Sequence, residues 1–199
     1  MRLAEEIAYV DIVSGGRLDV GVGAGSQIHE SQGLGSDFSH ANDRFVEALD
    51  ILHMAFESGR VAFDGEHFQV PDTPMSLRPL QRPHPPIYVA GMTSEPRVMC
   101  RVAKRGYRAF ASLFGPADGS AAEKREAVLQ GFDAAGVPRV QCHYAGQRLI
   151  YVTDDPEDAS EAAAHARDTL RLVHALKGGQ ARFQGHFAAP PANGALSIS

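Results

Sequence analysis

Two short glycine-containing segments are the places where this sequence could hold an anionic, planar ligand. One is Gly23-Ala24-Gly25-Ser26 and the other is Gly91-Met92-Thr93-Ser94, and each follows an apolar run typical of a buried strand. Glycine lets the backbone turn tightly and approach a ligand closely. Backbone N–H groups, with hydroxyls such as those of Thr93 and Ser94, can bind a phosphate group. We therefore predict cofactor-binding loops at these two segments.

Both segments also have a simpler structural interpretation, which the sequence leaves open. Small residues at the end of a strand are more often a turn than a ligand site. Thr93 or Ser94 could be the N-cap of the helix expected to follow, because hydroxyls accept hydrogen bonds from the free N–H groups of a first helical turn. Ser26 and Gln27 are further polar side chains that could contact a ligand beside the first segment.

No other group of residues has the spacing of a recognisable catalytic or metal site. The nine histidines include no H-E-x-x-H pattern. His29 and Glu30 follow the first segment closely and could contact a substrate or cofactor, although a solvated loop pair is the commoner situation. Cys100 and Cys142 have neither metal-site spacing nor a base at a catalytic spacing. We therefore assign no catalytic residue and predict no metal.

The composition limits the classes of partner. Lys and Arg number 19 against 24 Asp and Glu, which gives a formal net charge of −5 over 199 residues. Nucleic acid is therefore not an expected partner. No apolar run reaches the roughly 18 residues of a membrane span, and the acidic N-terminal segment is not typical of a signal peptide. With two cysteines and no disulfide framework, we expect a cytoplasmic protein that binds neither nucleic acid nor a membrane.

Hydrophobic periodicity predicts an alternation of strands and helices, which is typical of parallel βα units. A hairpin with a turn at Asp64-Gly65 and a proline-rich connector interrupt the alternation. The predicted helices are 2–14, 41–58, 95–105, 119–135 and 156–177, and the predicted strands are 18–24, 86–91, 107–113 and 148–153.

Two α/β architectures compete for this pattern. One is an open doubly wound sheet in which Gly21 to Gly25 would be a dinucleotide fingerprint. That fingerprint is weak, because its third glycine comes one residue too early and a long polar loop separates it from the next helix. The other architecture is a parallel barrel with helices outside, which needs no such fingerprint.

The sequence resembles the luciferase-like flavin-dependent monooxygenase family in several motifs that occur in the family's order over about 110 residues. A helix of the type R-L-A-E-E-I-A is followed by a D-x-x-S-G-G-R-L corner and then by a strand ending in G-V-G-x-G. The matching segments are Arg2 to Ala8, Asp11 with Ser14 to Leu18, Gly21 to Gly25, Arg44 to Leu52, Phe63 to Phe68, Leu77 to Pro79 and His84 to Gly91.

The resemblance implies a (β/α)8 TIM-type barrel that binds a reduced flavin at the carboxyl ends of its strands. The flavin is usually FMN, and in some relatives it is the deazaflavin F420. FMN members use O2 to oxidise a small organic substrate and can depend on a flavin reductase, whereas F420 members transfer hydride. Many members have Arg at the position of Ala24, so this chain lacks one cation that could bind the flavin phosphate.

The resemblance also implies an incomplete barrel, because the family's first three strands and two helices would precede Met1. We expect residues 1–178 to form a partial barrel with the first strands missing, and residues 179–199 to be a loop or disordered tail. Such a chain would be a homo-oligomer or would need a complementing chain, since an open parallel sheet leaves an unpaired edge. A non-catalytic remnant of the fold is the alternative to an active enzyme.

Overall fold

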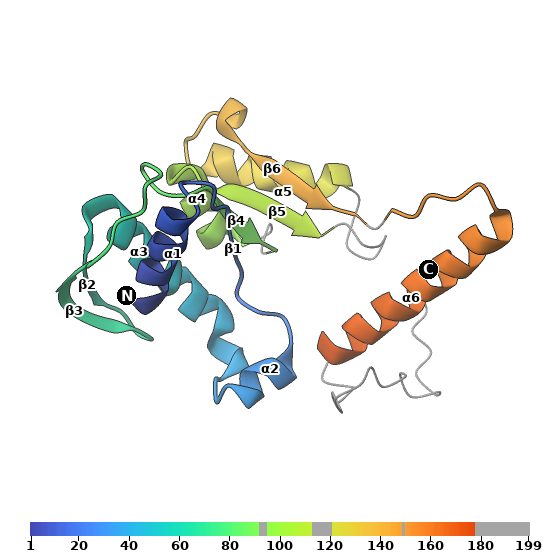
Figure 1. Ribbon diagram of the computed structural model, residues 1–199, viewed down its shortest axis with the longest axis horizontal. Helices are drawn as coiled ribbons and strands as arrows, with labels where there is room; N and C mark the ends of the chain where they lie inside the picture. The colour runs from blue at the N-terminus through green and yellow to red at the C-terminus, as the bar shows by residue number, and fades with distance from the viewer. Residues whose placement is uncertain (92–94, 113–120, 149, 178–199) are drawn as a thin grey trace. The chain divides into compact units, whose positions relative to one another are not determined.

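The computed structural model describes residues 1–91, 95–112, 121–148 and 150–177 (Figure 1). The chain divides into two compact units. The larger unit contains Met1–Ala24, Ala41–Ser112 and the described residues up to Gly146, and the smaller unit contains Gly25–His40 and the described residues from Gln147 onward. The expected tail, residues 179–199, lies outside the described residues, and the prediction of one domain over 1–178 stays a prediction.

The larger unit contains the sheet and the helices that cover it. A four-stranded sheet has the strand order β1-β4-β5-β6, in which β1, β4 and β5 run parallel, and a separate antiparallel pair is formed by β2 and β3. The elements are α1 (Arg2–Val13), β1 (Val20–Val22), α3 (Ala41–Ser58), β2 (Arg60–Asp64), β3 (Gln69–Pro74), β4 (Ile87–Ala90), α4 (Pro96–Lys104), β5 (Arg108–Ser112), α5 (Ala121–Ala134), η3 (Arg139–Gln141) and β6 (Tyr144–Gln147), whose last residue is counted with the smaller unit.

The smaller unit is helical in its described part. It consists of α2 (Ile28–Gly33), the short η1 (Phe38–His40) and the long α6 (Pro156–Lys177), and α2 packs against α6. Pro156 begins α6, where a missing N–H costs nothing, and Asp155 accepts a hydrogen bond from the Glu157 N–H at 2.9 Å. No helix in the described part of the chain is both long and apolar enough to cross a membrane.

The parallel order confirms the predicted α/β class. Strand β1 pairs with β4 through Val20 and Ile87, and β4 pairs with β5 through Val89 and Ala109. These four side chains are buried together with apolar residues of the helices, so they define the outer face of the sheet. Among the described residues the four strands of the sheet do not close into a barrel.

The opposite face of the sheet, here called the inner face, carries the alternate residues of the same strands. A side chain on a strand points to the opposite face from its neighbours. Gly21 and Ala90 are exposed, and Tyr88, Arg108 and Phe110 are only partly buried. The helices therefore cover one face of the sheet, and the inner face is the one that a closed barrel would bury.

The predicted two-residue turn at Asp64-Gly65 is wrong, because four residues connect β2 to β3. The Gly65 N–H donates to the Phe68 carbonyl at 2.9 Å, which closes the longer loop. Glu47 on α3 causes this geometry, since its carboxylate accepts backbone N–H groups of the loop. A tertiary contact therefore overrides the local preference of Asp-Gly for a tight turn.

The predicted strand at residues 148–153 is also wrong. Leu149 lies outside the described residues, and residues 150–153 form no strand. Ile150 and Val152 are 81% and 88% exposed. The last strand of the sheet is instead β6, and its approach is set by a hydrogen bond from the Ala109 N–H to the His143 carbonyl at 2.9 Å. A residue with high β-propensity suits a strand, but propensity alone does not provide a neighbouring strand to pair with.

Candidate functional site at the carboxyl edge of the sheet

The ends of β1 and β4 bring two of the predicted ligand segments together. Val22 is in register with Val89, so Gly23 follows beside Ala90. A Cβ atom placed on Gly23 would lie 3.6 Å from the Ala90 carbonyl oxygen. Gly91 then turns away with a φ of 69°, and its N–H donates to the Phe110 carbonyl at 2.9 Å. We call this place, where parallel strands end side by side, the carboxyl edge.

The structure places the eight predicted site residues in three groups. Gly23, Ala24 and Gly91 lie at the carboxyl edge of the larger unit. Gly25 and Ser26 belong to the smaller unit, where Gly25 has a φ of 82° and Ser26 is exposed. The remaining three, Met92, Thr93 and Ser94, lie outside the described residues.

The first turn of α4 is capped by Glu95. The other N-cap candidates, Thr93 and Ser94, lie outside the described residues. The Glu95 carboxylate accepts hydrogen bonds from the backbone N–H of Arg97 at 3.2 Å and from its Nε at 3.1 Å. The Arg97 side chain holds the pKa of Glu95 below its usual value, and Arg97 also binds Asp43 at 2.7 Å. Two carboxylates surround this one guanidinium, so the described start of α4 is not positively charged, and the dipole of α4 is partly neutralised there.

The described residues of the carboxyl edge fit a flat ligand better than they fit its phosphate. Gly91 has no described atom within 4 Å of the place where a Cβ would be, so its backbone is open to a ligand. Ala90 and Phe110 supply an apolar surface on the inner face next to it. Ala24 supplies no positive charge, and Arg97 is already bound. A planar ring system could therefore lie against the glycine backbone, as flavins and other flat cofactors require.

Tyr88 and Arg108 form a pair on the inner face that was not predicted from the sequence. These residues are register partners on β4 and β5. Arg108 donates a hydrogen bond to the Tyr88 hydroxyl, and its guanidinium carbon lies 5.0 Å from the centre of the Tyr88 ring. The two-residue alternation of both strands would have placed them on one face, but only the register brings them together.

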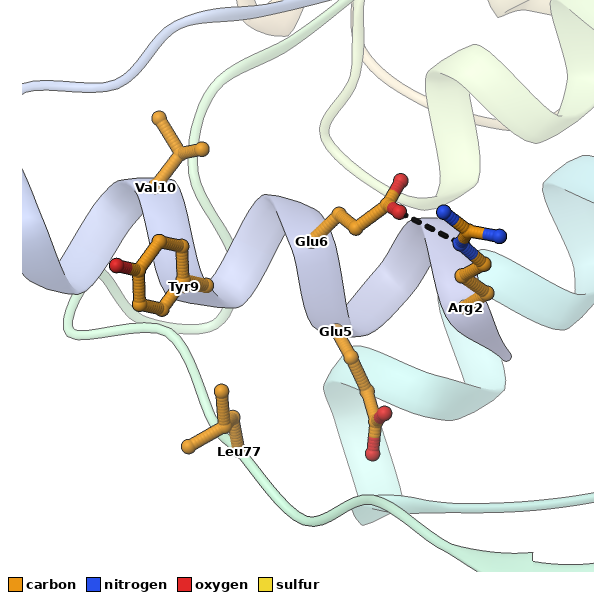
Figure 2. A pocket seen from close by; sticks show the side chains of 6 residues that line it. All are labelled: Arg2, Glu5, Glu6, Tyr9, Val10 and Leu77. Atoms are coloured by element: carbon orange, nitrogen blue, oxygen red, sulfur yellow. Dashed lines mark hydrogen bonds and ion pairs between the residues drawn. The ribbon is translucent and has the colours of Figure 1, made fainter.

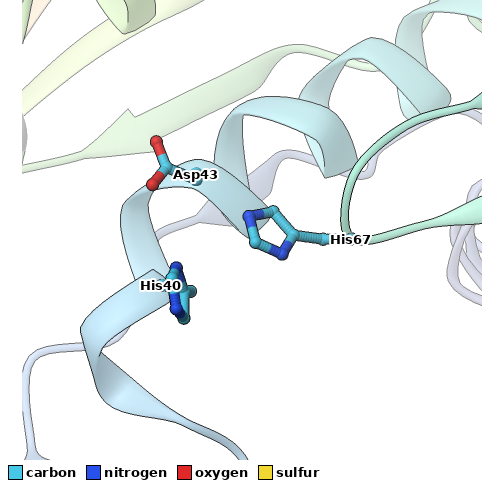
Figure 3. Close-up of side chains that lie close together, drawn as sticks. All are labelled: His40, Asp43 and His67. Atoms are coloured by element: carbon cyan, nitrogen blue, oxygen red, sulfur yellow. The ribbon is translucent and has the colours of Figure 1, made fainter.

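Asp43 and His67 also lie near one another. Figure 3 shows Asp43 on the first turn of α3 and His67 in the β2–β3 loop. An Asp43 carboxylate oxygen and a His67 ring nitrogen are within 4.8 Å of each other. Asp43 is also paired with Arg97 at 2.7 Å.

A shallow hollow of about 340 Å³ lies on the surface of α1 (Figure 2). Tyr9, Val10 and Leu77 supply its apolar walls, and Arg2 forms an exposed ion pair with Glu6 at 2.8 Å beside them. The hollow includes no residue of the strand ends. It is therefore a surface feature separate from the carboxyl edge.

The comparisons agree with this arrangement of parallel strands and glycine loops. The family model described as luciferase-like monooxygenase matches residues 1–195. The chain belongs to the luciferase-like monooxygenase family. An uncharacterised protein of Sinorhizobium fredii, y4vJ, is 31% identical over 176 residues, which cover 88% of this chain and 50% of that protein. The oxygenase component of a flavin-dependent trigonelline monooxygenase of Acinetobacter baylyi is 37% identical over 92 residues, which cover 45% of this chain and 25% of that protein.

Solved structures of enzymes share the fold. Monooxygenase RslO1 from Streptomyces bottropensis matches with a TM-score of 0.71 and 24% identity, covering 89% of this chain and 54% of that one. An F420-dependent secondary alcohol dehydrogenase matches with a TM-score of 0.64 and 24% identity, covering 87% and 52%. The chain therefore spans about half the length of these proteins, and the described fold is part of a TIM-type barrel.

Proposed function

We propose that this luciferase-like chain is part of a flavin-dependent monooxygenase that uses reduced FMN and O2 to oxidise a small organic substrate. The observation that carries the proposal is the juxtaposition of Gly23 and Gly91 at the carboxyl edge of adjacent parallel strands. In barrels of this type the ligand site is built at that end of the strands. The relative from Acinetobacter, which is named as flavin-dependent, supports the same cofactor class.

The residues at the carboxyl edge would hold and shield the flavin. The backbones of Gly23, Ala24 and Gly91 would lie against it, and Gly25, Ser26 and Met92 to Ser94 are proposed as further contacts. Ala90 and Phe110 would exclude water from the inner face beside it, which strengthens polar interactions there. Reduced FMN supplies the electrons for the reaction of O2 with the substrate.

A flavin reductase is the proposed source of reduced FMN. The Acinetobacter relative is named as an oxygenase component, which indicates a system of at least two proteins. We also propose that the chain works as a homo-oligomer or with a complementing chain, because the inner face and the outer edge of β1 have no described cover.

An F420-dependent oxidoreductase that transfers hydride is the second candidate. The match to an F420-dependent alcohol dehydrogenase favours it, and the neutral Ala24 is as compatible with F420 as with FMN. A non-catalytic remnant is the third candidate, since Ala24 and the bound Arg97 leave the described edge without a free cation for a phosphate.

A flavin titration with two matched glycine variants tests the proposal. Gly91→Ala and Gly106→Ala introduce the same Cβ at positions with φ of 69° and 67°, and neither Cβ would meet a described atom within 4 Å. Their backbone strain should therefore be similar. Only Gly91 lies at the carboxyl edge, because Gly106 precedes β5.

Quenching of flavin fluorescence by the full chain measures binding of FMN and F420. We expect FMN to bind. Gly91→Ala should raise the Kd about 10-fold, which corresponds to a loss of about 1.4 kcal/mol of binding free energy. Gly106→Ala should leave the Kd unchanged. Binding of F420 without FMN would replace the first candidate by the second. Binding of neither cofactor would favour the remnant. Equal effects of both variants would place the flavin away from Gly91.

A further inference from the structure

We propose that Asp43, Glu95 and Arg97 form a charged bridge that positions the glycine backbone at the carboxyl edge for the flavin. The inference rests on the proposed function, because it takes the backbone of Gly91 as a flavin contact. It adds three positioning residues, which act through Gly91 and do not themselves touch the flavin or its phosphate.

The charged bridge joins the start of α3 to the start of α4. Arg97 donates one hydrogen bond to the Asp43 carboxylate at 2.7 Å and another, from its Nε, to the Glu95 carboxylate at 3.1 Å. Glu95 also accepts the backbone N–H of Arg97 at 3.2 Å. The donors of a guanidinium have a fixed planar arrangement, so one guanidinium can hold two carboxylates at defined positions.

Glu95 is the described residue at which the chain from Gly91 enters α4. Its carbonyl accepts the N–H groups of Val98 at 3.1 Å and Met99 at 3.0 Å, whose side chains belong to the core. At the other end of the connection, the Gly91 N–H donates to the Phe110 carbonyl at 2.9 Å. A connection of only three residues has few conformations. A displacement of Glu95 should therefore also displace Gly91.

Asp43 is the anchored end of the charged bridge. It lies on the first turn of α3, four residues before Glu47 and so on the same side of the helix. The Glu47 carboxylate accepts three backbone N–H groups of the β2–β3 loop. A ring nitrogen of His67 in that loop lies within 4.8 Å of an Asp43 carboxylate oxygen. Asp43 is thus held between the β2–β3 loop and Arg97.

A second ionic link between α3 and α4 provides the contrast. Asp50 lies two turns beyond Asp43 on α3 and binds Arg101 and Arg105 toward the end of α4. Its side chain is 20% exposed, whereas those of Asp43 and Arg97 are 46% and 52% exposed. Half-exposed ion pairs contribute little to global stability. The charged bridge therefore differs from the Asp50 link in its place beside the connection to Gly91, and not in the strength with which it joins the helices.

The charges of the bridge favour positioning over direct binding of a phosphate. Arg97 holds the pKa of Glu95 below its usual value, so Glu95 is ionised at neutral pH. Two carboxylates around one guanidinium give the group a net charge of about −1, which repels an approaching phosphate dianion. Arg97 would have to release a carboxylate before it could bind a phosphate. Removal of the Asp43 charge should consequently weaken flavin binding, whereas a direct phosphate contact by Arg97 would make binding tighter.

Hydrogen exchange of the Gly91 amide, followed by NMR on the full chain, tests the charged bridge without a flavin. The reference is the Ala109 amide, which donates to the His143 carbonyl at 2.9 Å in the same sheet. We expect Asp43→Asn to speed exchange of Gly91 about 10-fold relative to Ala109, because the opening is local. Asp50→Asn is the matched control. It should speed both amides alike and leave their ratio unchanged.

Fluorescence titrations with FMN and riboflavin measure the consequence for binding. Asp43→Asn and Arg97→Gln should each raise the Kd of both flavins by roughly 5-fold, since a displaced glycine backbone affects the shared ring system. The double variant should bind no more weakly than Arg97→Gln alone, because both substitutions break the same bridge. Asp50→Asn should leave both Kd values unchanged.

Three results would overturn the inference: an unchanged exchange ratio in Asp43→Asn, tighter FMN binding by that variant, or a loss in Arg97→Gln that is confined to FMN. The last two would indicate a direct phosphate contact. If Arg97→Gln does not fold, Asp43→Asn alone decides both measurements. If the wild type binds neither flavin, the proposed function fails, and the exchange ratio still decides whether the charged bridge positions Gly91.

Discussion

Asp11, completely buried near the end of α1, accepts two hydrogen bonds from Gln81 in the connector before β4. The backbone N–H of Gln81 donates to Asp11 Oδ2 at 2.9 Å, and the side-chain Nε2 donates to Oδ1 at 2.8 Å. The same Nε2 also donates to the Leu18 carbonyl at 2.8 Å. One carboxylate thereby joins the end of a helix, the entry to β1 and the entry to β4, the two strands whose far ends form the carboxyl edge.

Replacing Asp11 should therefore destabilise the sheet through its entry loops. Asp11→Ala leaves two N–H donors of the half-buried Gln81 without their acceptor, which should lower the free energy of unfolding by about 2 kcal/mol. Asp11→Asn keeps one acceptor oxygen and should cost less. Urea unfolding followed by circular dichroism measures both values. Equal stability of Asp11→Ala and the wild type would show that the two hydrogen bonds do not hold these loops.

Asp50 should make stability depend on pH. It accepts hydrogen bonds from Arg101 at 2.8 and 2.7 Å and from Arg105, so it joins α3 to α4. Burial acts to raise the pKa of Asp50, but the hydrogen bonds from Arg101 and Arg105 outweigh it and hold the pKa below the usual 3.8. A lowered folded-state pKa gives stability that is present above the unfolded-state value and is lost as the pH falls through the folded-state value.

Asp50→Asn should consequently lose about 2 kcal/mol at neutral pH. The difference from the wild type should shrink as the pH falls below the usual pKa of 3.8, because the wild-type carboxylate becomes protonated there. Urea unfolding across a pH series checks this. A difference that stays constant down to the acid limit would mean that the charge of Asp50 does not contribute.

Glu47 should control the hairpin of β2 and β3. Its carboxylate accepts the N–H groups of Glu66, His67 and Phe68 at 2.8, 3.0 and 2.9 Å. Burial acts to raise the pKa of Glu47, but these backbone donors outweigh it and the pKa is lowered. Glu47→Gln loses part of this acceptor capacity, so limited proteolysis should cut the loop faster. Glu57→Gln, on the exposed end of α3, is the control, and equal cleavage of both variants would refute the role of Glu47.

The sequence was sufficient for elements whose signal is local. The helix at 41–58 and the strand at 86–91 follow from hydrophobic periodicity and from an apolar run, and the structure has them at Ala41–Ser58 and Ile87–Ala90. The strand expected at 148–153 failed because propensity is local and pairing is not. The same reason explains why the Tyr88–Arg108 pair could not be predicted, since the residues are 20 positions apart and meet only through the register.

The site was predictable in part. The two glycine loops were found because glycine after a buried strand is visible in the sequence, and the structure brings Gly23 and Gly91 to one edge. The cap of α4 was not found, because Glu95 was a weaker N-cap candidate than Thr93 or Ser94 by residue type. Glu95 occupies the N-cap position together with Arg97, whose side chain binds both Glu95 and Asp43.

Ala24 should limit the affinity for a phosphorylated flavin, and Ala24→Arg should raise it. Ala24 is at the carboxyl edge and only partly buried, so a longer side chain can extend from it. A guanidinium there would add charge-assisted hydrogen bonds to a phosphate, which are worth about 2 kcal/mol or roughly a 10-fold to 30-fold lower Kd. Riboflavin has no phosphate and should bind both proteins equally. Fluorescence titrations with FMN and riboflavin measure this difference. A gain for both flavins, or for neither, would place the flavin phosphate away from residue 24.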